Sequence, residues 1–256
     1  MDLWRLWVDD VPRRGFLNMA IDETLLRLAE TDGARILRLY RWSPPCLSFG
    51  RNEPARRRYR RDRIAERGLD VVRRPTGGRA VWHDAELTYA VAAPAATFGT
   101  RAETYLAIHR TLACALAELG LATTLAPAPV RAAAPDAGAC FAAPAGGEVL
   151  VGTRKVVGSA QLRGRTAFLQ HGSVLLDGDQ SVVADVSVGP AVRGGEGALT
   201  PLLGRRVGFE EVAEAVAAAA RTWGGEWRPI HRGDAILELA AAVADGYRSD
   251  EWTWER

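Results

Sequence analysis

The chain has 256 residues, of which 48% are hydrophobic and 25% charged, and its net charge is +2. A chain of this length buries roughly 70–75% of its unfolded surface, so it needs no disulfide or metal ion to hold a core. No apolar run approaches the ~20 residues that cross a bilayer, and the near-neutral charge gives no overall field toward a polyanionic partner.

Hydrophobic alternation and helical spacing predict the following elements in chain order. Strands are expected at residues 3–8, 36–41, 46–49, 70–74, 79–83, 86–92, 148–151, 155–163 and 167–176. Helices are expected at residues 18–30, 55–67, 102–119, 209–223 and 235–247. Several strands follow one another after short turns, which favours hairpins. The sequence therefore predicts an α/β (α+β) fold with mixed, largely antiparallel sheets and packed helices.

The composition of the basic residues singles out one lysine. Of 33 basic residues other than histidine, only Lys155 is a lysine and the other 32 are arginines. An ammonium is a compact charge that can give up a proton, whereas a guanidinium stays protonated. Lys155 lies in the apolar, glycine-punctuated stretch EVLVGTRKVVGSAQLRG, which is typical of a hairpin. It is either a chance survivor or a residue whose task an arginine cannot perform.

The three cysteines are widely scattered and lack CxxC spacing, which indicates reduced thiols and a cytoplasmic protein. The N-terminal residues 1–16 mix acids and arginines and do not resemble a signal peptide. Cys46 begins a predicted strand and Cys114 falls inside a predicted helix, so both are expected in the core. Cys140 ends an irregular stretch at residues 126–139, and a nearby cation such as Lys155 could lower the pKa of its thiol.

The segment VVRRPTGGRAVWHDAELTYAV contains the most structured motif. Arg73 and Arg74 end an apolar strand, the sequence Thr76-Gly77-Gly78 forms a turn, and Arg79 starts the next strand. The motif is either a simple hairpin turn with positive φ at its glycines, or a loop whose bare backbone approaches an anionic ligand beside the arginines. His83, Asp84 and Glu86 point to different faces of a strand and the other histidines are dispersed, so we expect no metal site.

A second irregular stretch lies at residues 188–200, and a basic run lies at residues 51–67. This run has eight arginines against two glutamates and one aspartate. It is either a solvated helix face or a docking surface for an acidic partner, which would be nucleic acid or an acidic carrier protein.

With these residues in hand, the chain resembles the biotin/lipoate protein ligase superfamily, and within it the octanoyl-carrier-protein:protein N-octanoyltransferases of the LipM type. The match rests on NMAIDE at residues 18–23, VRRPTGGR at 72–79 with HD at 83–84 and ELTY at 86–89, CFxAP at 140–144, RKVVGSAQ at 154–161, QHGS at 170–173 and SDEW at 249–252. The cysteine followed fifteen residues later by Lys155 is the feature specific to this type. Gly146 and Gly147 depart from it, since bulkier residues are usual there.

The resemblance implies one catalytic domain over residues 1–256, with a core at about 30–225 and a C-terminal helical segment at 226–256. It implies transfer of octanoate from an acyl carrier protein, through a thioester on Cys140, to a lysine of a lipoyl-domain protein such as the glycine cleavage H protein or a 2-oxoacid dehydrogenase E2. Neither ATP nor another cofactor is needed, because a thioester is already activated toward amines. Lys155 would lower the pKa of the Cys140 thiol.

The substrate-binding residues that the resemblance implies fall in the motifs just quoted. They are Arg73, Arg74, Thr76, Gly77, Gly78, Arg79, His83, Gly158, Ser159, Gln161, His171 and Gly172, and the backbone N–H groups near Gly158 and Ser159 are candidate oxyanion donors.

Three other functions stay open at the level of sequence. An ATP-dependent lipoate–protein ligase would share the glycine motif and the lysine but would not need Cys140. An octanoyl amidotransferase between lipoyl-domain proteins would use nearly the same chemistry. A nucleic-acid-binding module would explain the basic run, although the near-neutral charge and the lack of a known binding motif argue against it.

Overall fold

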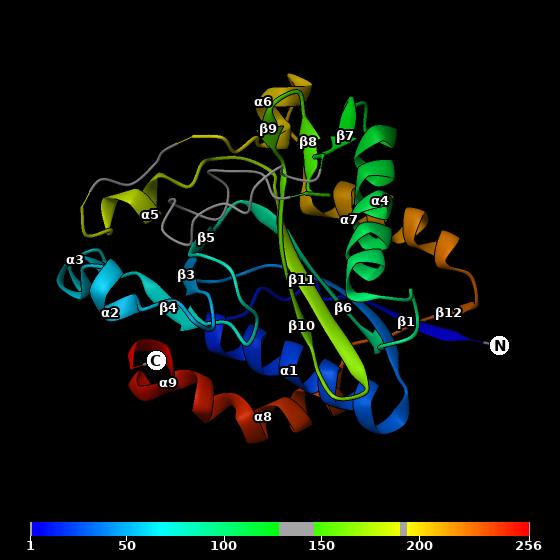
Figure 1. Cartoon of the computed structure of the whole chain (residues 1–256), viewed down its shortest axis with the longest axis horizontal. Helices are drawn as coiled ribbons and strands as arrows, with labels where there is room; N and C mark the ends of the chain where they lie inside the picture. Colours follow the sequence, from blue (N-terminus) through cyan, green and yellow to red (C-terminus); the bar gives the residue numbers. More distant parts are fainter. Residues whose placement is uncertain (1, 128–145, 190–193, 256) are drawn as a thin grey trace.

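A six-stranded sheet runs through the middle of the protein in this computed structural model, which describes residues 2–127, 146–189 and 194–255 (Figure 1). Its strand order is β10-β11-β6-β2-β1-β12. The bounds are β1 Leu3–Val8, β2 Arg35–Tyr40, β6 Glu86–Pro94, β10 Val157–Arg163, β11 Ala167–Leu175 and β12 Glu226–Pro229. The pairs from β10 to β2 are antiparallel, and the β2–β1 and β1–β12 pairs are parallel.

Two three-stranded sheets complete the strand content of the described residues. One has the order β4-β3-β5, with β3 Cys46–Phe49, β4 Asp70–Arg73 and β5 Val81–His83. The other has the order β7-β8-β9, with β7 Thr123–Leu125, β8 Val149–Val151 and β9 Arg154–Lys155. Only the β3–β4 pair among these is parallel. The predicted mixed, largely antiparallel fold is confirmed.

Helices cover both faces of the large sheet (Figure 1). Helices α1 (Gly15–Asp32) and α8 (Asp234–Arg248) pack together on one face, and α4 (Arg101–Glu118) and α7 (Phe209–Ala220) pack together on the other. Alternation along β2 explains this layering, because successive side chains point to opposite faces. Ile36 and Tyr40 join the core beside α1, whereas Leu37 and Leu39 join the core beside α4 and α7.

Short helices fill the remaining connections. They are α2 Ala55–Arg58, α3 Arg61–Glu66, α5 Ser181–Asp185, α6 Leu199–Leu203, the 3-10 turn η1 Arg221–Trp223 and α9 Asp250–Trp254. The single helix expected at 55–67 is therefore wrong. Tyr59 adopts an extended conformation between α2 and α3, and its buried ring stacks on Phe49 at 4.8 Å between ring centroids. Core packing of this tyrosine thus breaks the helix that local spacing favours.

The two ends of the chain meet the same sheet. β12 pairs in parallel with β1, and α8 and α9 lie under α1 and β4 (Figure 1). No helix in the described ranges is both long enough and apolar enough to span a membrane.

Candidate functional site

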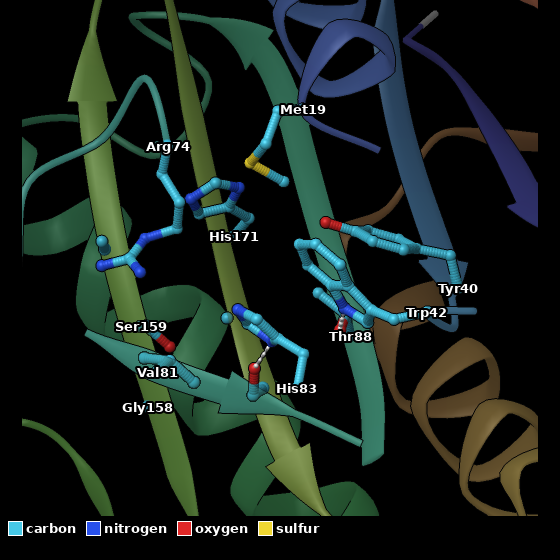
Figure 2. Close-up of a pocket in the computed structure, with 13 residues that line it drawn as sticks. Met19, Tyr40, Trp42, Arg74, Val81, His83, Thr88, Gly158, Ser159 and His171 are labelled. Carbon is cyan, nitrogen blue, oxygen red and sulfur yellow. Dashed lines mark hydrogen bonds between the residues drawn. The ribbon is translucent and has the colours of Figure 1, made fainter. Parts of the chain in front are cut away.

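A pocket opens where the β10–β11 hairpin, β5 and α1 converge (Figure 2). Its lining is Met19, Tyr40, Trp42, Arg74, Val81, His83, Thr88, Gly158, Ser159, Ala160, His171, Gly172 and Ser173. Arg74, His83 and His171 point toward the same space in Figure 2. The pocket thus combines an apolar wall with a small number of convergent polar groups, which is the usual composition of a small-molecule site.

Half of the residues expected to bind substrate reach this pocket and half do not. Those that line it are Arg74, His83, Gly158, Ser159, His171 and Gly172. Those outside its lining are Arg73, Thr76, Gly77, Gly78, Arg79 and Gln161.

The two adjacent arginines serve different tasks because consecutive residues at a strand end point to opposite sides. Arg73 is fully buried, and its guanidinium donates to the carbonyls of Gly50 (2.7 Å), Glu53 (2.8 Å) and Thr253 (2.9 Å). It ties α9 to the segment that follows β3 and lies outside the pocket lining, and its contact with substrate stays a prediction. Arg74 does line the pocket, and its Nη2 donates to the Arg79 carbonyl at 2.8 Å.

The turn at Gly77 and Gly78 contacts Gly50 and is linked to the pocket through Thr76 and His171. Gly78 has φ of +94°, as a tight turn requires, whereas Gly77 does not have a positive φ, so the expectation of positive φ at both glycines is half right. A Cβ at Gly50 would lie 1.8 Å from the Gly78 carbonyl oxygen, so bare backbone lets the two segments touch. Thr76 then reaches His171, with 2.6 Å between Oγ1 and Nε2.

His171 connects this turn to α1. Its Nδ1 lies 2.8 Å from Oδ2 of the buried Asp22, which also accepts a hydrogen bond from the Tyr40 hydroxyl at 2.8 Å. Asp22 further accepts from Arg38, which neutralises its charge in the core. The NMAIDE motif on α1 therefore orients a pocket histidine, a link that sequence spacing alone does not reveal.

His83 has its tautomer fixed by its neighbours. The Ser48 hydroxyl accepts from Arg74 at 2.6 Å. The Glu86 carboxylate at Nδ1 only accepts, so in the neutral ring Nδ1 carries the proton and Nε2 accepts from the Ser48 hydroxyl at 2.6 Å. Nδ1–H then donates to Glu86 Oε1 at 2.7 Å. Burial lowers the pKa of His83 more than Glu86 raises it, and its ring stacks on Trp42 at 4.0 Å. His83 thus presents a neutral imidazole to the pocket.

A polar chain reaches the pocket from the α4 side. Ser159 Oγ lies 2.8 Å from His109 Nε2 and 2.6 Å from the Tyr89 hydroxyl. His109 Nδ1 lies 2.6 Å from the Gly147 carbonyl oxygen. Gln161 is outside the pocket lining and hydrogen-bonds to Gln170 at 3.1 Å. His109 was not singled out from the sequence, because its partners lie 38 and 50 positions away along the chain.

Lys155 is buried with an acidic partner. The residue is 1% exposed, and Nζ donates to Glu148 Oε1 at 2.6 Å. Glu148 is 4% exposed and precedes β8, so the β8–β9 hairpin brings the pair together. A chance surface survivor would be exposed, and that alternative is wrong. Glu148 is the acidic residue at the start of the apolar hairpin that carries the only lysine of the sequence. That position was the signal that could have identified it as the partner of Lys155.

The cysteines divide into three cases. Cys140 lies outside the described residues, so its role stays a prediction. Cys46 is fully buried, as expected, and burial raises the pKa of its thiol. Cys114 is exposed, so the expectation of a core position is wrong. The buried stripe of α4 contains Ile108, Leu112 and Leu116, and position 114 lies off that stripe.

Within the described residues, no group of three or more histidine, cysteine or acidic side chains is placed to hold a metal ion.

Known proteins match this chain over its length. Residues 14–221 match the lipoyl protein ligase A/B catalytic domain family. An octanoyltransferase LipM from Kyrpidia tusciae is 36% identical over 100% of both chains, and that of Bacillus subtilis is 32% identical over 100% of this chain and 99% of its own. A crystal structure of lipoate-protein ligase A bound with ATP superimposes with a TM-score of 0.80 at 22% identity, covering 98% of each chain.

A bipartite lipoate protein ligase from Thermoplasma acidophilum, studied with its E2 lipoyl domain, has a TM-score of 0.76 at 20% identity over 99% of this chain and 97% of its own. At these identities the solved structures establish the fold, and the curated sequence relatives establish the family. The chain belongs to the lipoyl protein ligase A/B catalytic domain family.

Proposed function

We propose that this protein is an octanoyltransferase that moves octanoate from an acyl carrier protein to a lysine of a lipoyl-domain protein. The full-length likeness to octanoyltransferases at 36% and 32% identity carries this proposal. The buried Lys155–Glu148 pair supports it from the structure, since a lysine held away from solvent is suited to act on a neighbouring reactive group.

In the first step, the thiolate of Cys140 attacks the carbonyl carbon of the octanoyl thioester. The carbon–sulfur bond to the carrier breaks, and the carrier thiol leaves with its electron pair and a proton. Lys155 favours the thiolate by charge or hydrogen bonding. Because Glu148 offsets much of its positive charge, Lys155 would act on the thiolate more by donating a hydrogen bond than by its long-range field.

In the second step, the amine of the acceptor lysine attacks the acyl-enzyme. The result is an amide-linked octanoyl group and a free Cys140 thiol. No nucleotide takes part, because the thioester bond already supplies the activation. The E2 lipoyl domain studied with the T. acidophilum ligase illustrates the kind of acceptor that we propose for this chain.

We also propose that residues 1–256 form one catalytic domain and that it works in the cytoplasm. The shared sheet of β1 and β12 supports the first statement, and the scattered cysteines support the second.

Intact mass spectrometry after mixing with octanoyl-carrier protein, without ATP, tests the function. We expect one octanoyl adduct that hydroxylamine removes and that Cys140→Ser abolishes. Cys114→Ser is the matched control, because its exposed thiol reports on adventitious acylation. Strict dependence on ATP, Mg²⁺ and free fatty acid would instead identify a ligase. Loading from an octanoylated lipoyl domain, but not from carrier protein, would identify an amidotransferase.

A further inference from the structure

Each hydrogen bond in the polar chain at Ser159 has a defined donor and a defined acceptor. His109, in the middle of α4, determines which atom donates. His109 is fully buried and its Nδ1 lies 2.6 Å from the Gly147 carbonyl oxygen. A carbonyl oxygen only accepts hydrogen bonds, so Nδ1 carries the proton. Burial lowers the pKa of His109 to about 4, so the ring is neutral near pH 7. Nε2 therefore carries a bare lone pair.

That lone pair determines how the Ser159 hydroxyl is oriented. Ser159 Oγ lies 2.8 Å from Nε2, so Ser159 gives its single proton to His109. The Tyr89 hydroxyl, 2.6 Å away, must then donate to Ser159. The amide of Gln170 donates in turn to Tyr89 at 3.2 Å. Every proton along this chain therefore points toward His109.

The backbone around Gly147 is built for this contact. Gly147 has φ of +83°, and a Cβ there would lie 2.7 Å from a methyl carbon of Leu106. Glycine thus lets the carbonyl approach α4. The ring of Tyr105 lies 4.1 Å from the His109 ring between centroids, which restricts it further. The departure from bulkier residues at this position accordingly has a structural reason.

Ser159 lines the pocket beside Arg74 and His171 (Figure 2). Because its proton points away into α4, its oxygen can only accept from a molecule in the pocket. An oxyanion needs donors, so this hydroxyl does not stabilise one. An amine brings N–H donors, and it must also lose a proton as it forms an amide.

We propose that Ser159 is a catalytic residue that binds the attacking amine of the acceptor lysine, and that His109 is the positioning residue that receives the proton through Ser159. This inference rests on the proposed function. The amine attacks in its neutral form, and the new N–C bond forms. A proton passes from nitrogen to Ser159 Oγ, while the original Ser159 proton passes to His109 Nε2. The C–S bond then breaks with its electron pair on sulfur, and the proton on His109 returns through Ser159 and leaves to solvent.

The charge next to His109 favours the return of the proton. Lys155 acts on His109 electrostatically and lowers its pKa, so the imidazolium is a short-lived carrier of the proton. The buried Glu148 partner fixes the position of Lys155 and offsets part of its charge, so burial remains the larger cause of the low pKa of His109. His109 is thus charged only while the intermediate exists.

The test separates the two half-reactions. Wild type, Ser159→Ala and His109→Gln are loaded from octanoyl-carrier protein, and the isolated acyl-enzyme is then mixed with a lipoyl-domain protein or with hydroxylamine. Both reactions are measured on the same isolated acyl-enzyme, so that any change in loading does not enter the comparison, and hydroxylamine cleavage should slow far less than transfer. Transfer to the lipoyl-domain lysine should fall at least ~10²-fold, as is typical for loss of proton transfer. Glutamine can still accept the Ser159 hydrogen bond but cannot take its proton.

Thr111→Val is the matched control on α4. Its hydroxyl is buried and bonded to the Ala107 carbonyl and the Trp223 indole, outside the pocket lining. It should leave both half-reactions unchanged. Equal slowing with lysine and hydroxylamine, or unchanged transfer in Ser159→Ala, would overturn the inference alone. A wild-type enzyme that never loads would remove the proposed function as well. If His109→Gln does not fold, Ser159→Ala carries the test.

Discussion

The buried Lys155–Glu148 pair makes a measurable prediction about stability. At the observed 2.6 Å and an effective dielectric near 20, the Coulomb attraction is about 6 kcal/mol. Desolvation of the two charges offsets much of it, so the pair as a whole adds little. Removing one partner is different, because it leaves a buried charge uncompensated. We expect Glu148→Leu and Lys155→Met each to lower the free energy of unfolding by about 3–5 kcal/mol.

A double-mutant cycle measured by urea unfolding tests this reasoning. In the double variant Lys155→Met/Glu148→Leu no unpaired charge remains, so its stability should return to within about 1–2 kcal/mol of wild type. If each single variant lost less than about 1 kcal/mol, or if the two losses simply added, the pair would not be coupled as the structure indicates. The restored double variant should still fail to load octanoate, which separates the role of Lys155 in folding from its role in the reaction.

Three further predictions concern Lys155, His109 and the basic run at residues 51–67. Lys155→Arg should fold but lose at least ~10²-fold in the rate of acyl-enzyme formation, because a guanidinium is wider and does not release a proton. A variant that loads octanoate at the wild-type rate would show that positive charge alone suffices. Burial lowers the pKa of His109 from 6.5 to about 4. The free energy of unfolding should therefore be full above pH 6.5 and fall by about 3 kcal/mol as the pH drops toward 4. Urea midpoints compared across pH should show a smaller loss in His109→Gln. Arg57→Glu should raise KM for the carrier protein at low salt, whereas an unchanged KM would make the basic run a solvated face; Arg58 and Arg61 are poorer probes because they pair with Glu53 and Asp250.

Short apolar runs bounded by turn residues predicted several strands well. The ranges 3–8 and 46–49 coincide with β1 and β3, because buried strands have a local period that the side chains display directly. The helix break at Tyr59 was missed, since it depends on packing against Phe49 from a different element. Short elements such as α5 and β7 were also missed, because three to five residues carry too little pattern.

The candidate site was predictable to the extent that its residues fall in compact motifs. The motif around Arg74 and the QHGS stretch around His171 both reach the pocket. The motif gave no way to distinguish Arg73 from Arg74, because the distinction depends on α9, which follows almost 180 residues later. The partners of Lys155 and Ser159 were missed for the same reason, since Glu148 and His109 become neighbours only through the tertiary fold.

The distance along the chain between Arg73 and its α9 partner also matters while the protein is being made. Arg73 and Thr253 are 180 positions apart. At translation rates of about 5–20 residues per second, roughly 10–40 s pass between the synthesis of the two residues. Throughout that interval the Arg73 guanidinium lacks the Thr253 carbonyl that helps to bury it, and the neighbouring glycine turn lacks its tie to α9. The contact between Arg73 and α9 therefore forms only after α9 has been synthesised, so in earlier nascent chains the Gly50 and Glu53 carbonyls must hold this guanidinium without α9.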